Sequence, residues 1–336
     1  MKFKTHFSLA RFVWAAAFTA FWCVPGCPFA AAQKAQKPNQ EYAVAIVAAP
    51  VYITADAQSQ KLATMEPGRE MAVLPDSTRG WLHVVANIEG GPLEADSDEQ
   101  QGKNVTGWVQ DRGAIHTSTQ SGDRIVFGAA AEAEAEASKR GGRRGAAQEA
   151  MRLYSLLAED FPSSALAGEA AWRAADIRWQ MERADVFSRP SAKERDPNMR
   201  ERINEDYLHH VERKFPHTKW ADLAAYDLID NKICGQWNGA AKCPEKEADL
   251  YEKYAAEHPQ SPKAPEALYN AAWRESALME IYKGNGDAKK AEQARNQALK
   301  LAQQLVSQYT DSDWAARGNT LLYKINQSIP TYGNGE

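Results

Sequence analysis

A four-residue phrase recurs four times in the second half of the chain: Phe161-Pro162-Ser163-Ser164, Phe215-Pro216-His217-Thr218, His258-Pro259-Gln260-Ser261 and Tyr309-Thr310-Asp311-Ser312. An apolar residue stands four positions before the start of each copy, at Leu157, Val211, Tyr254 and Leu305. Alanine stands six positions after each start, at Ala167, Ala221, Ala264 and Ala315. Because proline stops a helix and Ser or Thr caps the next, each copy predicts helix, stop, cap and helix. Such repeats build extended scaffolds, which favours a binding protein over a catalyst.

The first 32 residues have the pattern of a secretory signal peptide. Basic residues precede an apolar run over 12–24, and alanines follow it: Lys2, Lys4, Arg11, Ala30, Ala31 and Ala32. A membrane anchor is a weaker interpretation, because a spanning helix needs about 20 apolar residues and Pro25 interrupts this run. A second possibility stays open, since residues 24–27 resemble an imperfect lipobox in which Cys27 carries the lipid. We expect a periplasmic or secreted protein, or a membrane-anchored lipoprotein if Cys27 is lipidated.

Composition and charge exclude some classes of partner. The chain has 336 residues, of which 44% are hydrophobic and 25% charged, as expected of a folded soluble protein. Cleavage after residue 32 removes three positive charges and lowers the formal net charge from −4 to −7. The basic cluster at 139–144 lies among glycines, which favours a solvent-exposed hinge. An acidic chain lacks the basic footprint of a nucleic-acid binder, so we expect no nucleic-acid partner.

Two cysteines remain after cleavage, Cys234 and Cys243, and they enclose a short turn-rich segment. In an oxidising compartment such a pair predicts a disulfide that closes one loop. The alternative is a reactive or metal-bound thiol. It lacks support, because the sequence has no C-x-x-C motif and no His at ligand spacing beside either cysteine.

Residues 41–117 consist of short Val- and Ile-rich runs separated by Gly, Pro, Asp and Asn. The expected strands span 42–48, 51–54, 61–65, 70–74, 81–86 and 107–110. Short strands at this density predict a small closed β-barrel, because closure removes exposed edges.

This first region resembles the bacterial SH3-like (SH3b) domain. The resemblance rests on Val51-Tyr52-Ile53, on 62–68, on Gly80-Trp81-Leu82-His83-Val84 and on Gly107-Trp108-Val109. The chain departs from the usual pattern of this family in two places. Residues 51–56 stand where the family usually has Asn-Val-Arg-x-Gly-Pro, and an acidic loop over 89–106 lengthens one hairpin. The resemblance implies a barrel that binds peptides or cell-wall material in a groove lined by Tyr52, Trp81 and Trp108. The alternative is that the two Trp side chains belong to the barrel core.

Residues 118–145 predict a linker, with a polar turn followed by an Ala-Glu stretch that forms a connecting or spacer helix. We expect packing to begin at Ala146.

Residues 146–328 resemble the tetratricopeptide (TPR) repeats of bacterial envelope proteins, through Ala150, Tyr154, Leu157 and Pro162 and through the Gly-Asp turn at 286–287. The phrases lie 54, 43 and 51 residues apart, more than the family's 34, and insertions at 188–197 and 234–243 explain the excess. The resemblance implies an all-α solenoid of about eight helices between Ala146 and Gln327.

The helices that follow each phrase would line the inner surface of this solenoid. Four of their side chains are candidates for a peptide-binding surface: Arg173, Arg178, Tyr226 and Arg274. The nearby rings Trp172, Trp179, Tyr269 and Trp273 could serve the same surface, although aromatic residues at helical spacing usually pack between repeats.

Glu205, Asp206, His209 and His210 form the best catalytic candidate, since a carboxylate and an imidazole four residues apart share a helix face. Two ligands do not make a metal site, and no other catalytic motif is present in the sequence. We therefore expect no enzyme, no cofactor and no metal. The sequence predicts an exported envelope scaffold that binds envelope proteins and cell-wall peptide, with an outer-membrane assembly lipoprotein-like component as the alternative.

Overall fold

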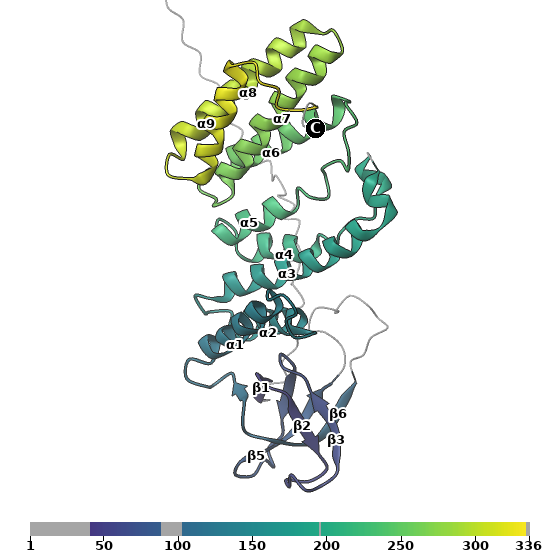
Figure 1. Ribbon diagram of the computed structural model, residues 1–336. Helices are drawn as coiled ribbons and strands as arrows, with labels where there is room; N and C mark the ends of the chain where they lie inside the picture. The colour runs from purple at the N-terminus through teal and green to yellow at the C-terminus, as the bar shows by residue number, and fades with distance from the viewer. Residues whose placement is uncertain (1–40, 89–102, 195, 334–336) are drawn as a thin grey trace, which may run out of the picture. The chain divides into compact units, whose positions relative to one another are not determined.

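The computed structural model describes residues 41–88, 103–194 and 196–333, in which a β-sheet is followed by α-helices (Figure 1). The expected signal peptide, Cys27 and most of the acidic loop lie outside the described residues. No helix in the described ranges is both long and apolar enough to span a membrane.

The described part of the first region holds seven antiparallel strands in one sheet. They are β1 (Glu41–Ala45), β2 (Ala49–Tyr52), β3 (Lys61–Met65), β4 (Glu70–Val73), β5 (Trp81–Asn87), β6 (Asn104–Gln110) and β7 (Ala114–His116). Their order across the sheet is β3-β2-β6-β5-β4-β1-β7. The alternation expected of half-buried strands is clearest in β5, where Leu82, Val84 and Ala86 point into the core and the residues between them are half-buried.

The sheet does not close into the barrel that we expected. Its two edges are β3 and β7, and no hydrogen-bonded pairing joins them in the described residues. Strand β2 meets β6 at one residue pair only, Tyr52 with Trp108. The β7 edge is covered in another way, because Ile115 on this strand packs into a core shared with the first helices.

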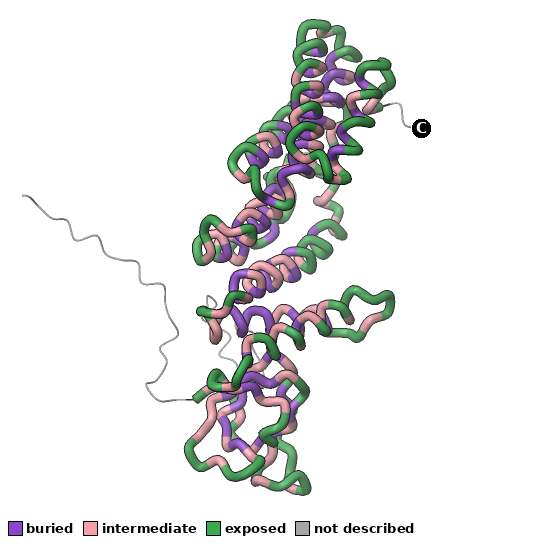
Figure 2. Tube along the Cα trace, turned by 90° about the vertical axis from the view of Figure 1, so that its left-hand side faces the viewer, coloured by how far each residue is buried: buried purple, intermediate pink, exposed green. Residues whose placement is uncertain are grey.

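The helical region contains nine α-helices in the described residues. They are α1 (Gly122–Ala137), α2 (Ala146–Asp160), α3 (Ala167–Ser188), α4 (Asp206–Lys214), α5 (Lys219–Asp227), α6 (Lys242–Glu257), α7 (Ala264–Gly284), α8 (Ala288–Gln308) and α9 (Asp313–Asn326). Of two short 3-10 helices, η1 (Pro190–Lys193) lies in the first predicted insertion and η2 (Pro197–Met199) begins at the last residue of that insertion. Eight α-helices follow Gly145, as predicted. Figure 2 shows buried residues where neighbouring helices face one another.

The repeated phrase stops the preceding helix in all four copies, but it caps the next helix with a side chain in only two. Ser164 and Ser261 accept from the N–H groups of Leu166 and Lys263 instead, and they do not cap α3 and α7. Helices α2, α4, α6 and α8 each end one residue before a phrase, and the first N–H of each phrase donates to the carbonyl four residues earlier. The Thr218 and Ser312 side chains then accept hydrogen bonds from Ala221 N and Ala315 N and cap α5 and α9. The apolar anchors before the phrases and the alanines after them are all buried.

Packing of the helices begins earlier than Ala146. Helix α1 lies in the expected linker, but Val126, Ala130 and Ala133 bury one of its faces against α2. Tyr154 on α2 donates to Glu134 on α1 over 2.7 Å. Helix α1 is thus the first helix of the first pair and not a spacer, because its small alanine side chains allow it to pack closely against α2.

The sheet and the first helical pair share one hydrophobic core. Val44 of β1 and Ile115 of β7 pack in the same cluster as Leu153 and Leu157 of α2. The opposite end of the helical region is different, since the outer residues of α9 are mostly polar and exposed. A polar terminal helix is what a stack of helices needs where the stacking stops.

Candidate functional site

The three aromatic residues predicted for the barrel groove lie on one face of the sheet. Tyr52 on β2 is directly opposite Trp108 on β6, and Trp108 is directly opposite His83 on β5. Directly opposed residues of antiparallel strands point to the same side, so these three side chains form a row across three strands. Trp81 is two residues from His83 on β5 and shares its side. We call Tyr52, Trp81, His83 and Trp108 the aromatic face.

The rings of the aromatic face are in contact. His83 and Trp108 stack with centroids 4.7 Å apart and planes 11° from parallel. Tyr52 and Trp81 meet edge to face with centroids 5.7 Å apart. All four side chains are half-buried, and the inner core of the sheet contains none of them. The alternative that the two Trp residues fill the core is therefore wrong. In β5 and β6 the residues next to them, Leu82 and Val109, point into the core, so the Trp side chains point to the other face.

His83 is held by polar contacts at the rim of this face. Its Nδ1 lies 2.7 Å from Asp76 Oδ1, and its backbone N–H donates to Ser77 Oγ over 3.0 Å. The hydrogen bond with His83 lowers the pKa of Asp76. Sequence reasoning had not assigned His83, although its position two residues after Trp81 in an alternating strand was a usable signal.

Gly107 allows β2 to approach β6 beneath the aromatic face. A Cβ atom at this position would lie 2.5 Å from the carbonyl oxygen of Tyr52 and 2.8 Å from Val51 Cγ1. The glycine before Trp108 therefore sets the distance between the Tyr52 and Trp108 strands.

The candidate peptide-binding residues of the helices are engaged in contacts within the protein. Arg173 pairs with Glu134 and Glu169 at 2.7 and 2.9 Å. Arg178 pairs with Glu182 and lies 3.7 Å from the ring centroid of Tyr207. The nearby rings contact partners on other helices: Tyr226 with Tyr254, Trp172 with Trp220 and Tyr269 with Trp314.

Arg274 is not an accessible anchor. It is 8% exposed, and its Nε donates to Glu247 Oε2 on α6 over 2.7 Å. Glu247 is 2% exposed and also accepts from Cys234 N and Trp237 Nε1, at 2.9 and 3.0 Å. An acidic partner on the neighbouring helix thus turns the expected surface arginine into a core residue.

The predicted disulfide between Cys234 and Cys243 is confirmed, with Cα atoms 6.0 Å apart. The loop that it closes is docked by Trp237, whose ring lies 5.2 Å from that of Trp273 and 5.5 Å from that of Tyr332. The loop thereby joins α6, α7 and the C-terminal segment.

The catalytic candidate of the sequence does not assemble into one cluster. His209 Nδ1 lies 2.7 Å from Glu212 Oε2 and its Nε2 lies 3.6 Å from Glu205 Oε2. Glu205 is also bound by Arg202 and by the Asn231 side-chain amide. His210 is exposed and lines a hollow between α2, α3 and α4 instead. Among the described residues, no group of three or more His, Cys, Asp or Glu side chains is placed to hold a metal ion.

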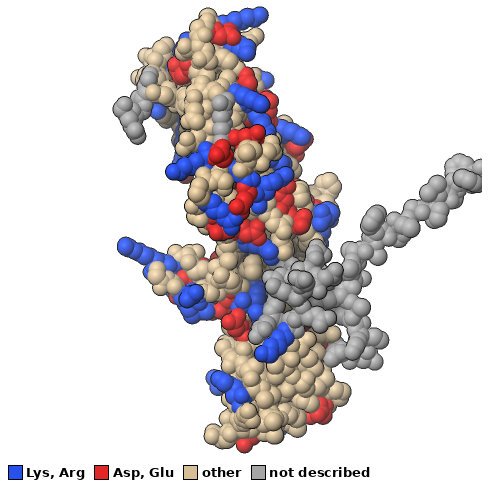
Figure 3. All heavy atoms as spheres, turned by 90° about the vertical axis from the view of Figure 1, so that its right-hand side faces the viewer, with Lys and Arg blue, Asp and Glu red and all other residues tan. Residues whose placement is uncertain are grey.

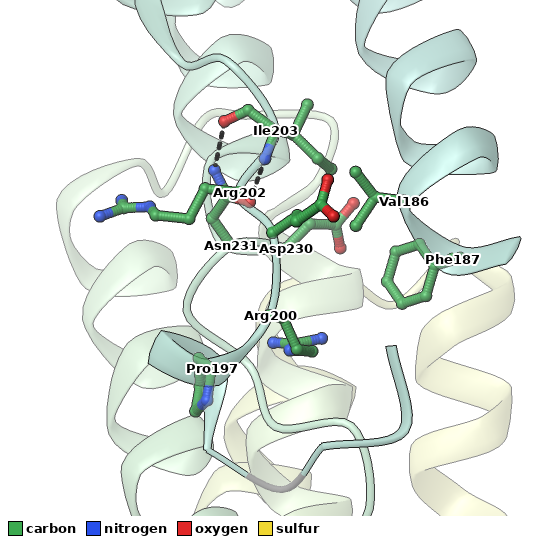
Figure 4. A pocket seen from close by; sticks show the side chains of 9 residues that line it. Val186, Phe187, Pro197, Arg200, Arg202, Ile203, Asp230 and Asn231 are labelled. Carbon is green, nitrogen blue, oxygen red and sulfur yellow. Dashed lines mark hydrogen bonds between the residues drawn. The ribbon is translucent and has the colours of Figure 1, made fainter. Parts of the chain in front are cut away.

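Figure 4 shows a pocket beside the first insertion, lined on one side by Val186 and Phe187. Asn231 bridges its wall, donating to Ile203 O and accepting from Ile203 N. The cavity offers only about 10 Å³ of space to the centre of a water-sized sphere. A single buried water already needs roughly 10–15 Å³ on this measure, so the pocket is a packing gap beside the insertion.

The aromatic face is therefore the accessible feature that best fits a binding role. Charged side chains of both signs are interspersed over the helices, whereas the view of the sheet in Figure 3 is largely uncharged. Comparison of the chain with protein-family models and with curated proteins finds no match.

Proposed function

We propose that the protein is an exported, non-enzymatic scaffold of the bacterial cell envelope. Its sheet resembles an SH3b domain and binds cell-wall peptide or a protein partner. Its helical pairs resemble TPR repeats and bind another envelope protein. The observation that carries this proposal is the row of Tyr52, Trp108 and His83 on the half-buried side of three strands.

Ring side chains on an accessible strand surface suit recognition of a peptide. They offer a large contact area with few rotatable bonds, and Trp and Tyr dominate the binding energy of many interfaces. The stacked pair and the edge-to-face pair fix these rings before a ligand arrives. Pre-ordered side chains reduce the entropy that binding must overcome.

Sedimentation with purified peptidoglycan tests the role of the sheet. We expect the wild-type protein to bind, and Trp81→Ala and Trp108→Ala to weaken binding at least tenfold, which is the loss of an interface anchor worth about 1.4 kcal/mol or more. Trp314→Ala is the matched control, since this half-buried ring packs against Tyr269 at the other end of the chain. Absence of binding, or equal loss in all three variants, would overturn wall recognition.

Mass spectrometry of the mature protein tests export and separates the two candidate localisations. We expect Gln33 as the first residue. A diacylated Cys27 would instead support the outer-membrane lipoprotein-like alternative, which rests on the imperfect lipobox at 24–27.

A further inference from the structure

Two arginines meet where the turn between β3 and β4 rests on α2. The turn contains Gly68, which has a positive φ of 76°, and Arg69 follows it directly. A Cβ atom on Gly68 would lie 2.7 Å from Arg152 Cβ, so the turn and α2 are in contact at this point. Arg69 is thus the residue next to this contact, and its charge acts on that of Arg152 across the seam between sheet and helices.

Arg152 makes its hydrogen bonds with two of its three nitrogens. Its Nε and Nη2 donate to the carbonyl oxygen of Pro67 at 3.2 and 3.1 Å, and Nη2 also lies 3.1 Å from Glu66 Oε2. The Arg152 side chain is 12% exposed, whereas that of Glu66 is 61% exposed.

Arg69 lacks any such partner. Its Nε and Nη1 are shielded from solvent, and neither has a hydrogen-bond acceptor within the described ranges. A buried guanidinium N–H group without an acceptor is costly, and native structures rarely leave one. Burial lowers the pKa of Arg152, and the nearby charge of Arg69 lowers it further.

The charge balance at this seam leaves room for an anion. Glu66 is the one carboxylate that forms a described ion pair with either arginine, and it is mostly in solvent. Glu149 also lies near Arg152, but it is bound by Arg143 Nη2 at 2.6 Å. Guanidinium groups match the geometry of carboxylate and phosphate oxygens better than any other side chain.

We propose that Arg69 and Arg152 bind an oxyanion, a carboxylate or a phosphate group, at the seam between the β3–β4 turn and α2. Arg69 as a whole is half-buried, so the anion approaches from the solvent side of the turn, and the guanidinium turns to meet it because no hydrogen bond holds Nε and Nη1 in place. The anion supplies acceptors for the unpaired N–H groups and offsets the repulsion between the two cations. This site shares no residue with the aromatic face and does not depend on the function of that face.

Calorimetric titration of the full mature protein tests the site, with inorganic phosphate and acetate as separate probes at constant ionic strength in chloride buffer. We expect saturable binding of at least one probe, and the tighter one identifies the chemical source of the oxyanion. Arg69→Gln should weaken that binding roughly ten- to a hundredfold, the effect of one charge-assisted hydrogen bond. The fold should survive this change, because Arg69 makes no described side-chain hydrogen bond.

Arg79→Gln is the matched control, because Arg79 is an exposed arginine of the same sheet region and should leave the affinity unchanged. Arg152→Gln should weaken binding as well, but it also removes the bonds to Pro67, so Arg69→Gln is the deciding variant. Failure of the wild-type protein to bind either probe, or an unchanged affinity in Arg69→Gln, overturns the proposal.

Discussion

Glu247 and Arg274 form an ion pair inside the helical region, with Arg274 Nε 2.7 Å from Glu247 Oε2. The two residues are 2% and 8% exposed and lie on neighbouring helices, α6 and α7. The carboxylate also accepts two hydrogen bonds from the disulfide-closed loop. One buried charge pair thus connects two helices with the insertion between α5 and α6.

We expect Glu247→Ala to destabilise the protein by about 3–5 kcal/mol, because it leaves the Arg274 charge buried without a partner. Glu257→Ala is the control: its exposed pair with Lys253 should contribute roughly 0–1 kcal/mol. Urea unfolding measures both. Replacing Glu247 and Arg274 together with Leu and Met should restore only part of the loss, since Cys234 N and Trp237 Nε1 would then lack their acceptor. Equal stability of the two single variants would contradict this account.

The disulfide should stabilise the fold without taking part in binding. Replacing both Cys234 and Cys243 with Ala should cost about 2–3 kcal/mol, the loop-entropy value for so short a loop. Calorimetric melting measures the loss, and peptidoglycan sedimentation should be unchanged. Thiol labelling of the unreduced, denatured protein should detect no free cysteine. Detection of two labelled thiols would support the reactive-thiol interpretation instead. So would a double variant that loses binding to peptidoglycan while its stability is unchanged.

Stability should fall as the pH rises from about 4 to about 7. Burial, followed by the charges of Asp176 and Asp230, raises the pKa of Asp227 from 3.8 to about 7. Between these values the unfolded chain has released this proton and the folded protein retains it, so rising pH favours unfolding. Burial, followed by nearby carboxylates, also raises the pKa of Glu275 to about 7, with the same sign.

Asp227→Asn should reduce the slope of unfolding free energy against pH in this window, and adding Glu275→Gln should reduce it further. Urea titrations between pH 4 and 8 measure the slope. Asp311→Asn, at an exposed phrase position, is the control and should leave it unchanged. A wild-type slope in the double variant would mean that neither carboxyl group is responsible.

Gly68→Ala should destabilise the contact between the β3–β4 turn and α2. Two effects combine there, because Gly68 has a positive φ and an added Cβ would lie 2.7 Å from Arg152 Cβ. Gly80→Ala separates them, since Gly80 has a φ of 81° but nothing within 4 Å of an added Cβ. We expect about 1–2 kcal/mol of loss at Gly80 and a further 1–3 kcal/mol at Gly68. Similar losses at both positions in urea unfolding would show that the close approach is unimportant.

Local patterns predicted much of this structure. The four copies of the phrase specified the ends of α2, α4, α6 and α8, because stopping a helix depends on neighbouring residues alone. The strand pattern also placed Trp81 and Trp108 on short strands, although pairing of Trp108 with both Tyr52 and His83 had to come from the sheet order.

The errors concern contacts between distant residues. Arg274 looked like a surface anchor because its buried partner, Glu247, is 27 residues away. Helix α1 was predicted as a connecting or spacer helix from its Ala-Glu stretch, and its buried face becomes evident only from its contact with α2. Closure of the sheet could not be judged from strand lengths, because it depends on whether β3 and β7 meet.

The core that Val44 and Ile115 share with Leu153 and Leu157 determines how the chain can be divided. A cut between residues 117 and 122 would separate side chains that exclude water only together, and each fragment would expose an apolar surface. The sheet is consequently not a detachable module that could be exchanged between proteins at its own boundary. Any transferable piece must therefore include α1 and α2, and a cut after Asp160 would still divide this core, because Ala167, Ala170 and Ile177 of α3 belong to it as well.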